Sequence, residues 1–218
     1  MRSSVSNLRS ATKSGKKRII RYSLKMSIKK EKCVQKTDEQ LVKLTLKNQD
    51  WFFCIVRRYE GKLLGYIRRI SGVGQQEAED VLQDVFLKIY QNLNDFDPDL
   101  KFSSWIYRIT HNQVISNYRK IKARPQSIFV DNENIFDGIA SGLDLNREVN
   151  LRELRKVIRR ALTRIDKKYR EVLILKFLEE KDYQEISDIL KRPSGTVAAQ
   201  IKRGKEKLKK ELLTQNLL

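Results

Sequence analysis

The sequence is poor in the residues that build most catalytic and metal sites. It has one histidine, His111, and two cysteines, Cys33 and Cys54, in 218 residues. A structural zinc site of the usual histidine and cysteine kind takes about four such ligands, and a histidine-based triad would depend on His111 alone. We therefore expect no metal site and no role in catalysis for this histidine. Two cysteines are too few for a disulfide framework, which indicates a reducing compartment.

Turn-forming residues and long apolar runs are also scarce. The 9 glycines and 3 prolines are few for an all-β protein with many turns, whereas Leu, Ile, Lys, Arg, Glu and Gln are common. This composition predicts an all-α fold. No apolar run approaches the roughly 20 residues of a membrane span, so we expect no membrane insertion and a cytoplasmic location.

Acidic residues are outnumbered, with 46 basic against 27 acidic side chains and a net charge of +19. Such an excess indicates a polyanionic partner, usually nucleic acid. More than half of it lies in residues 1–36, where 12 basic residues stand against one acidic residue. This segment lacks apolar periodicity and is predicted to be a disordered extension. Three readings stay open: a nucleic-acid-binding arm, a transit peptide, or an upstream extension of a chain that begins at Met26.

Amphipathic periodicity begins at Thr37, which has the spacing of a capping box with Gln40. The apolar positions then predict four helices: two joined near residues 48–50, the second of them ending at 71–74, one over 76–90 and one from Ser103 or Ser104 to Arg124. Residues 125–147 lack periodicity and are predicted to be a flexible linker. Periodicity returns at Leu151, so we predict two small helical domains, 37–124 and 148–218.

The last unit has the pattern of a helix-turn-helix. Tyr183, Ile186 and Leu190 form the apolar stripe of a short helix, residues 191–193 form a tight turn, and Ser194 is the expected N-cap of a second helix. The stripe of that second helix is Val197, Ile201, Gly204 and Leu208. In a helix-turn-helix the second helix enters the major groove of DNA. A helical hairpin with a solvated basic face is the alternative.

The predicted helix 76–90 raises a different question, because Glu77, Asp80 and Asp84 share one stripe. Like charges at this spacing cost a few tenths of a kcal/mol per pair. A solvated helix face is one explanation. An enzyme with Asp80 and Asp84 as paired carboxylates or metal ligands is another, but it has no histidine partner and no glycine-rich phosphate loop. We predict no catalytic residue, no cofactor and no enzyme activity.

Two blocks resemble bacterial sigma factors. The stretch YQEISDILKRPSGTVAAQIKRGKEKL is similar to their region four, and AEDVLQDVFLKIY with FDPDLKFSSWIYRITHNQVISNYRK is similar to region two. The blocks appear in the family's order, with a linker and no third domain between them. This arrangement resembles the extracytoplasmic-function group of the sigma-70 family, and the resemblance covers residues 37–212.

The resemblance implies a sigma factor that binds core RNA polymerase and directs promoter recognition, duplex opening and transcription initiation. Promoter DNA, double-stranded and locally melted, is then a partner, and an anti-sigma factor is a further candidate partner. The runner-up is an autonomous helix-turn-helix regulator that binds duplex DNA without polymerase. Under the sigma-factor reading, 1–36 is an extension, 37–124 is region two and 148–218 is region four.

The same resemblance assigns three groups of residues. The polar face of the helix 76–90 would dock on a basic coiled coil of the polymerase clamp through Asp80, Gln83 and Asp84. The minus-ten element would be met by Arg108, Asn112, Arg119 and Lys120. The minus-thirty-five element would be met by Ser194, Thr196, Ala199, Gln200, Lys202 and Arg203.

Departures from the family pattern concern base reading. Members often place Lys, Ser and Arg where this chain has Ala198, Ala199 and Gln200, which implies fewer phosphate contacts and a distinct base preference. We expect Gln200 to pair bidentately with an adenine and Lys202 to contact DNA without regard to sequence. Trp105 matches a family tryptophan, but its spacing predicts a core residue.

Overall fold

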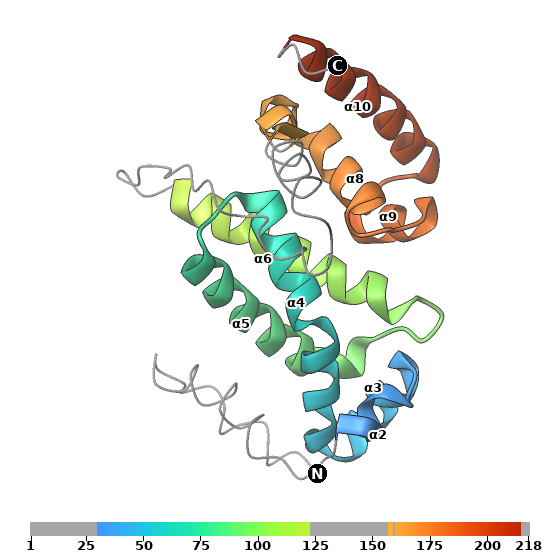
Figure 1. The fold of residues 1–218 in the computed structure, drawn as a ribbon. Helices are drawn as coiled ribbons and strands as arrows, with labels where there is room; N and C mark the ends of the chain where they lie inside the picture. The colour runs from blue at the N-terminus through green and yellow to red at the C-terminus, as the bar shows by residue number, and fades with distance from the viewer. Residues whose placement is uncertain (1–29, 123–156, 159, 215–218) are drawn as a thin grey trace, which may run out of the picture.

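The computed structural model describes residues 30–122, 157–158 and 160–214, and within these ranges the chain forms helices and short 3-10 turns but no strand (Figure 1). The predicted all-α class is confirmed. The linker 125–147 and residues 1–29 lie outside the described part. The helices are α2 (Lys30–Val34), α3 (Asp38–Lys47), α4 (Phe52–Ser71), α5 (Gln75–Gln91), α6 (Phe102–Lys122), α8 (Lys167–Phe177), α9 (Tyr183–Leu190) and α10 (Ser194–Thr214).

The ends of the first helices follow from local chemistry. Thr37 Oγ1 accepts a hydrogen bond from the Gln40 amide at 3.3 Å, and Gln40 Oε1 accepts one from the Thr37 amide at 3.1 Å. This is the predicted capping box, which satisfies amides that the first turn of α3 leaves unpaired. Gly72, with φ of 72°, closes α4 in the left-handed region that glycine adopts at little cost. The predicted breaks near 48–50 and 71–74 are confirmed.

Helix α2 contradicts part of the predicted disorder, since residues 30–34 are helical and fixed to α4. Cys33 and Cys54 form a disulfide with Cα atoms 5.2 Å apart. This pairing was not predicted from the sequence. The two residues are 21 positions apart, and only the packing of α2 against the start of α4 brings them together.

Arg58 of α4 supplies a second attachment for the same segment. Its guanidinium donates to the backbone oxygens of Cys33 at 2.7 Å and Lys36 at 2.6 Å, and it pairs with Asp38 at 2.6 Å. The chain that enters α3 is thus held covalently and by hydrogen bonds to a charged group, which are the stronger kind.

We expect reduction of this disulfide to lower the free energy of unfolding by about 3 kcal/mol, because the bond closes a loop of intermediate length in the unfolded chain. Urea denaturation with and without reductant measures the difference. The Cys33→Ser/Cys54→Ser variant is the control and should show one curve under both conditions. Coincident curves for the native chain would contradict the prediction.

Helices α4, α5 and α6 pack around the predicted apolar positions. On α5 the buried residues follow helical spacing: Ala78, Val81, Leu82, Val85, Phe86 and Ile89. Trp105 is 4% exposed and packs against the rings of Phe96 and Phe102. Its predicted place in the core is confirmed.

The C-terminal helices dock on this body instead of standing apart from it. Helix α9 packs on α6, α8 contacts α4, and α10 covers α8 and α9 (Figure 1). One apolar cluster runs through both halves and includes Ile67 and Ile106 together with Val172, Leu175 and Ile186. We call this packing of α8 and α9 on α4 and α6 the closed arrangement. The sequence predicted both helical units but gave no sign of their contact.

Candidate functional site

The acidic stripe lies on the outer side of α5. Asp80 is exposed, and Gln83 and Asp84 are half-buried. Asp84 Oδ2 accepts a hydrogen bond from Gln113 Nε2 of α6 at 3.5 Å. The apolar stripe of α5 faces the opposite way, so the structure presents the three predicted residues together on one surface.

The outer side of α6 carries the predicted minus-ten residues. Arg108, Asn112 and Arg119 are spaced by four and seven residues, which places them on one helical face. Arg108 is half-buried, whereas Asn112, Arg119 and Lys120 are exposed. Buried residues such as Ile106, Thr110 and Val114 fill the other faces. The helix thus offers one polar, basic stripe.

Helix α10 holds the third predicted group. Ser194, Thr196, Ala199, Lys202 and Arg203 are exposed, and Gln200 is half-buried. The buried residues Val197, Ile201 and Gly204 confirm the predicted inward stripe. The space at Gly204 is tight, since an added Cβ would lie 3.2 Å from the Leu173 side chain. Helix α10 can therefore pack closely on α8.

Two details of the predicted helix-turn-helix were wrong. The helix already includes Ser194, and the Val197 amide donates to the Pro193 carbonyl at 3.0 Å, so Pro193 is at the N-cap position instead of Ser194. On α9 the buried residues are Ile186 and Ile189, whereas Tyr183 is 43% exposed. Tyr183 instead lies beneath the ammonium of Lys176, 4.9 Å from its ring centroid.

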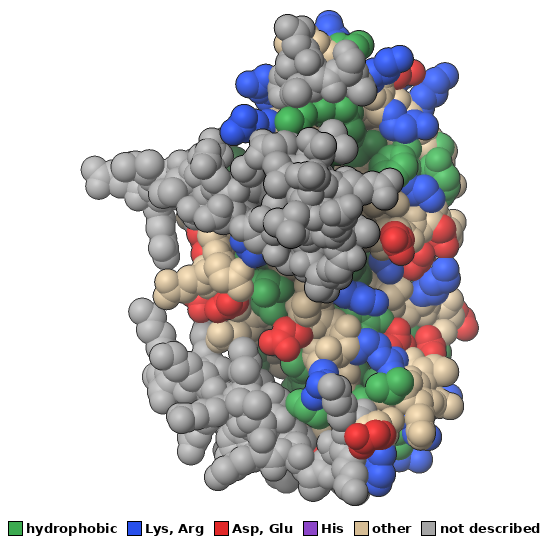
Figure 2. All heavy atoms as spheres, viewed as in Figure 1, with side chains coloured by type: hydrophobic (Ala, Val, Ile, Leu, Met, Phe, Trp, Pro, Cys, Tyr) green, Lys and Arg blue, Asp and Glu red, His purple; other side chains and the backbone are tan. Residues whose placement is uncertain are grey.

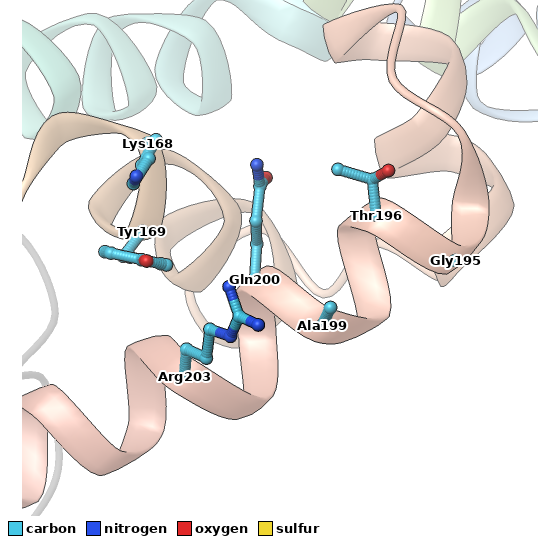
Figure 3. A pocket seen from close by; sticks show the side chains of 7 residues that line it. All are labelled: Lys168, Tyr169, Gly195, Thr196, Ala199, Gln200 and Arg203. Atoms are coloured by element: carbon cyan, nitrogen blue, oxygen red, sulfur yellow. The ribbon is translucent and has the colours of Figure 1, made fainter.

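A hollow of about 310 Å³ lies between the start of α8 and α10. Figure 3 shows Gln200 and Thr196 rising from α10 toward it, with Lys168 and Tyr169 of α8 on the other side. Its lining residues are Lys168, Tyr169, Gly195, Thr196, Ala199, Gln200 and Arg203. Lys and Arg side chains gather around this end of the molecule (Figure 2). Positive charge of this kind attracts the DNA backbone.

A buried ion pair joins the two halves of the closed arrangement. Glu179, in the loop after α8, accepts hydrogen bonds from both Arg69 Nε, at 2.8 Å, and Arg69 Nη2. It also accepts one from the Tyr107 hydroxyl at 2.7 Å. The Glu179 side chain is only 4% exposed, and this burial raises the pKa of its carboxyl while the Arg69 guanidinium opposes the rise. Loss of either partner would leave a buried charge unpaired.

A more exposed set of contacts lies beside this pair. The ammonium of Lys181 donates to Ser103 of α6 and to Glu185 of α9, each at 3.1 Å. Lys101 pairs with Asp182 at 2.9 Å at the solvent-facing edge. The Glu185 amide and then Lys101 lower the pKa of Asp182 to about 2. These contacts fix the start of α9 against the start of α6.

His111 occupies the third contact between the halves. Its Nδ1 lies 3.1 Å from the Tyr66 hydroxyl, and its Nε2 lies 3.8 Å from the Glu171 carboxylate of α8. Burial lowers the pKa of His111 from its ordinary 6.5, and the cations Arg192 and Lys167 add to this effect, while Glu171 acts against it. The closed arrangement therefore disfavours the protonated imidazole.

We expect the closed arrangement to weaken as the pH falls below 6.5. Separation of the halves takes Glu171 and α8 away from His111, which then recovers its ordinary pKa and binds a proton that the closed form does not. Above 6.5 both forms carry the neutral ring and the effect vanishes. Small-angle scattering against pH, compared with the His111→Gln variant, measures it. Identical pH profiles for the two chains would contradict this role.

Sequence reasoning missed the residues that join the halves, namely Arg69, Glu179 and Glu171. Glu171 is 5% exposed and begins the run EVLIL on α8. A lone carboxylate next to so apolar a run was a usable signal of a buried pair. Arg69 and Glu179 gave none, because nothing in their spacing reveals contacts across 110 positions.

The described residues hold no group of three or more His, Cys, Asp or Glu side chains arranged for a metal ion. None of the described helices is both long and apolar enough to cross a membrane.

Comparison with known proteins identifies two sigma-factor families in the chain. The family Sigma-70 region 2 matches residues 55–124, and the family Sigma-70, region 4 matches residues 155–208. The ECF RNA polymerase sigma factor SigW of Bacillus subtilis (strain 168) is 35% identical over 188 residues, which cover 80% of this chain and 98% of that protein. The ECF RNA polymerase sigma-E factor of Escherichia coli (strain K12) is 33% identical over 180 residues, 79% of this chain and 92% of the other.

Solved structures share the fold. CnrH, in complex with the cytosolic domain of CnrY, aligns with a TM-score of 0.58 at 26% identity over 80% of this chain and 96% of that one. The sigma factor RpoE of Bartonella quintana, in complex with the anti-sigma factor NepR, aligns with a TM-score of 0.59 at 21% identity over 72% of this chain and 93% of the other. The chain belongs to the ECF group of the sigma-70 family, the sigma factors that bind RNA polymerase and direct it to promoters.

Proposed function

We propose that this sigma factor divides its work among α5, α6 and α10. The acidic stripe of α5 (Asp80, Gln83, Asp84) docks on a basic surface of core RNA polymerase. The outer residues of α6 (Arg108, Asn112, Arg119, Lys120) hold the opened minus-ten element. The outer residues of α10 (Ser194, Thr196, Ala199, Gln200, Lys202, Arg203) read the minus-thirty-five element as duplex. The observation that carries the proposal is the exposure of nine of these thirteen residues, with the other four half-buried, on helices whose other faces are buried.

The chain on this proposal catalyses no reaction itself, because polymerase makes the bonds. Region two comprises 37–124 and region four comprises 148–218, with 125–147 as the linker and 1–36 as an extension. The chain acts in the cytoplasm, where polymerase and promoter DNA meet. An anti-sigma factor is a further proposed partner, supported by the solved complex of the sigma factor RpoE with the anti-sigma factor NepR.

Promoter binding requires the closed arrangement to open. Two elements that lie two helical turns apart on B-DNA are separated by about 70 Å. In the closed arrangement α6 packs directly on α9, the helix that precedes α10. The two reading helices therefore share one compact body, and region four must leave region two before both elements are engaged.

Co-purification with core RNA polymerase followed by runoff transcription tests the proposal. We expect the chain to elute with core enzyme and to support transcription only from templates that carry both promoter elements. A gel shift without polymerase distinguishes the sigma factor from the alternative, an autonomous helix-turn-helix regulator. Such a regulator binds duplex DNA tightly on its own. Tight duplex binding together with failure to bind core enzyme would overturn the sigma-factor proposal.

A further inference from the structure

Arg192, in the turn between α9 and α10, contacts the predicted base-reading residue Gln200. Its Nη1 donates to Gln200 Oε1 at 3.0 Å and to the Lys168 carbonyl at 3.4 Å. Its Nη2 donates to Glu171 Oε2 at 2.8 Å. One guanidinium thus ties α10 to α8 at three points.

The backbone and the guanidinium of Arg192 are both held in place. Its amide donates to the Ser187 carbonyl at 3.2 Å, and its carbonyl accepts from the Ser187 hydroxyl at 2.6 Å. Lys191 before it adopts a left-handed conformation with φ of 52°. Glu171, which holds the far end, is buried. A planar fork held in this way loses little side-chain entropy when it forms hydrogen bonds.

This contact determines what Gln200 can offer to DNA. A bidentate pair with adenine needs the glutamine oxygen to accept from N6 while its nitrogen donates to N7. In the structure Gln200 Oε1 faces the guanidinium of Arg192. The amide nitrogen of Gln200 therefore points away from Arg192. Gln200 then presents N–H donors to a base, which differs from the adenine contact expected from the sequence.

We propose that Arg192 is a positioning residue that sets the base preference of Gln200. Arg192 takes one of the two acceptor sites of the Gln200 oxygen and fixes the rotation of the amide, with that oxygen directed toward the guanidinium. Gln200 in this orientation favours a base edge that offers acceptors, guanine O6 and N7 or thymine O4, over adenine, whose N6 is a donor. The inference rests on the proposed reading of the minus-thirty-five element by α10. Arg192, Gln200 and Glu171 all lie in the C-terminal unit, so the contact persists when the closed arrangement opens.

The test uses holoenzyme and a promoter library randomised in the upstream element. We expect the native chain to disfavour adenine at the position read by Gln200, and the same profile shows whether guanine or thymine replaces it. The Arg192→Met variant frees the oxygen and should raise adenine usage at that position roughly tenfold relative to the other bases. The change should be absent when Arg192→Met is combined with Gln200→Ala.

Two further variants keep the result interpretable. Lys202→Ala removes one positive charge from the same unit, as Arg192→Met does, but at an exposed position. It should lower transcription from all library members alike. Arg192→Lys retains a charge for Glu171 but lacks the fork that reaches Gln200 as well. It should therefore shift the base profile as Arg192→Met does while conserving more of the thermal stability.

An unchanged base profile in both Arg192 variants would overturn the inference, and so would a shift that persists in the Gln200→Ala background, which would mean that Arg192 acts on DNA directly. These outcomes leave the proposed function intact, because transcription by the native chain is scored in the same assay. Absence of transcription from every template would overturn the proposed function and this inference together.

Discussion

Reversing both Asp80 and Asp84 to Arg should reduce the affinity for core RNA polymerase by at least about 100-fold, because like charges facing each other at an interface cost several kcal/mol. Asp80 is exposed and Asp84 half-buried, and both lie off the buried stripe of α5. The substitution should change the free energy of unfolding only slightly, since surface changes usually stay within about 0.5 kcal/mol. Binding of labelled factor to core enzyme and thermal denaturation of the same variant measure the two effects.

The matched control reverses Glu39 and Glu60, two exposed carboxylates on α3 and α4. It adds the same charge to the same domain, so it should leave polymerase affinity nearly unchanged. The single variant Asp80→Arg leaves the Asp84–Gln113 hydrogen bond in place. It should still account for a large part of the loss of polymerase affinity. If the double variant kept its polymerase affinity, the docking role of α5 would be wrong, and a collapsed melting temperature would show that the carboxylates are structural.

Replacing Arg69 by Met should release region four from region two. The substitution keeps most of the apolar stem but leaves the buried carboxylate of Glu179 without its cation, a loss that typically costs about 3–5 kcal/mol. The closed-to-open ratio should then fall by a factor of roughly 100 or more. Small-angle scattering measures the change as a larger radius of gyration.

Lys101→Ala is the matched control, because it removes the solvent-exposed ion pair with Asp182 that also joins the two halves. This variant should barely change the scattering curve. Exchanging the charges, with Arg69→Glu and Glu179→Arg together, should restore part of the compact form. A native radius of gyration in Arg69→Met would show that the apolar cluster alone holds the halves together.

Much of the fold follows from local patterns that the sequence displays. The capping box at Thr37, the glycine that ends α4 and the apolar spacing of α5 each act within a few residues, so the helices and most of their inward faces were predictable. The Cys33–Cys54 disulfide and the helix that it fixes were not. Both depend on contacts between helices, about which periodicity says nothing.

The candidate site was likewise predictable from the sequence only in part. The residues on the outer faces of α5, α6 and α10 were predicted because the family resemblance assigns each of them a role. The partners that orient them were missed, as Arg192 shows. It lies in a turn, its guanidinium reaches across to α8, and its effect on Gln200 depends on which atom of the amide it meets. Such an effect is visible only in side-chain geometry.

The shared core of the two domains also bears on how strongly the factor binds a promoter. On the proposal that only open molecules engage both elements, the apparent dissociation constant equals the intrinsic one divided by the open fraction. A chain that is open about 1% of the time would bind about 100-fold more weakly than its contacts allow. Asp80 stays exposed in the closed form, so on the proposed docking role of α5 polymerase can engage region two first. If polymerase then favours the open chain, the two partners bind cooperatively, and each raises the affinity for the other by the same factor.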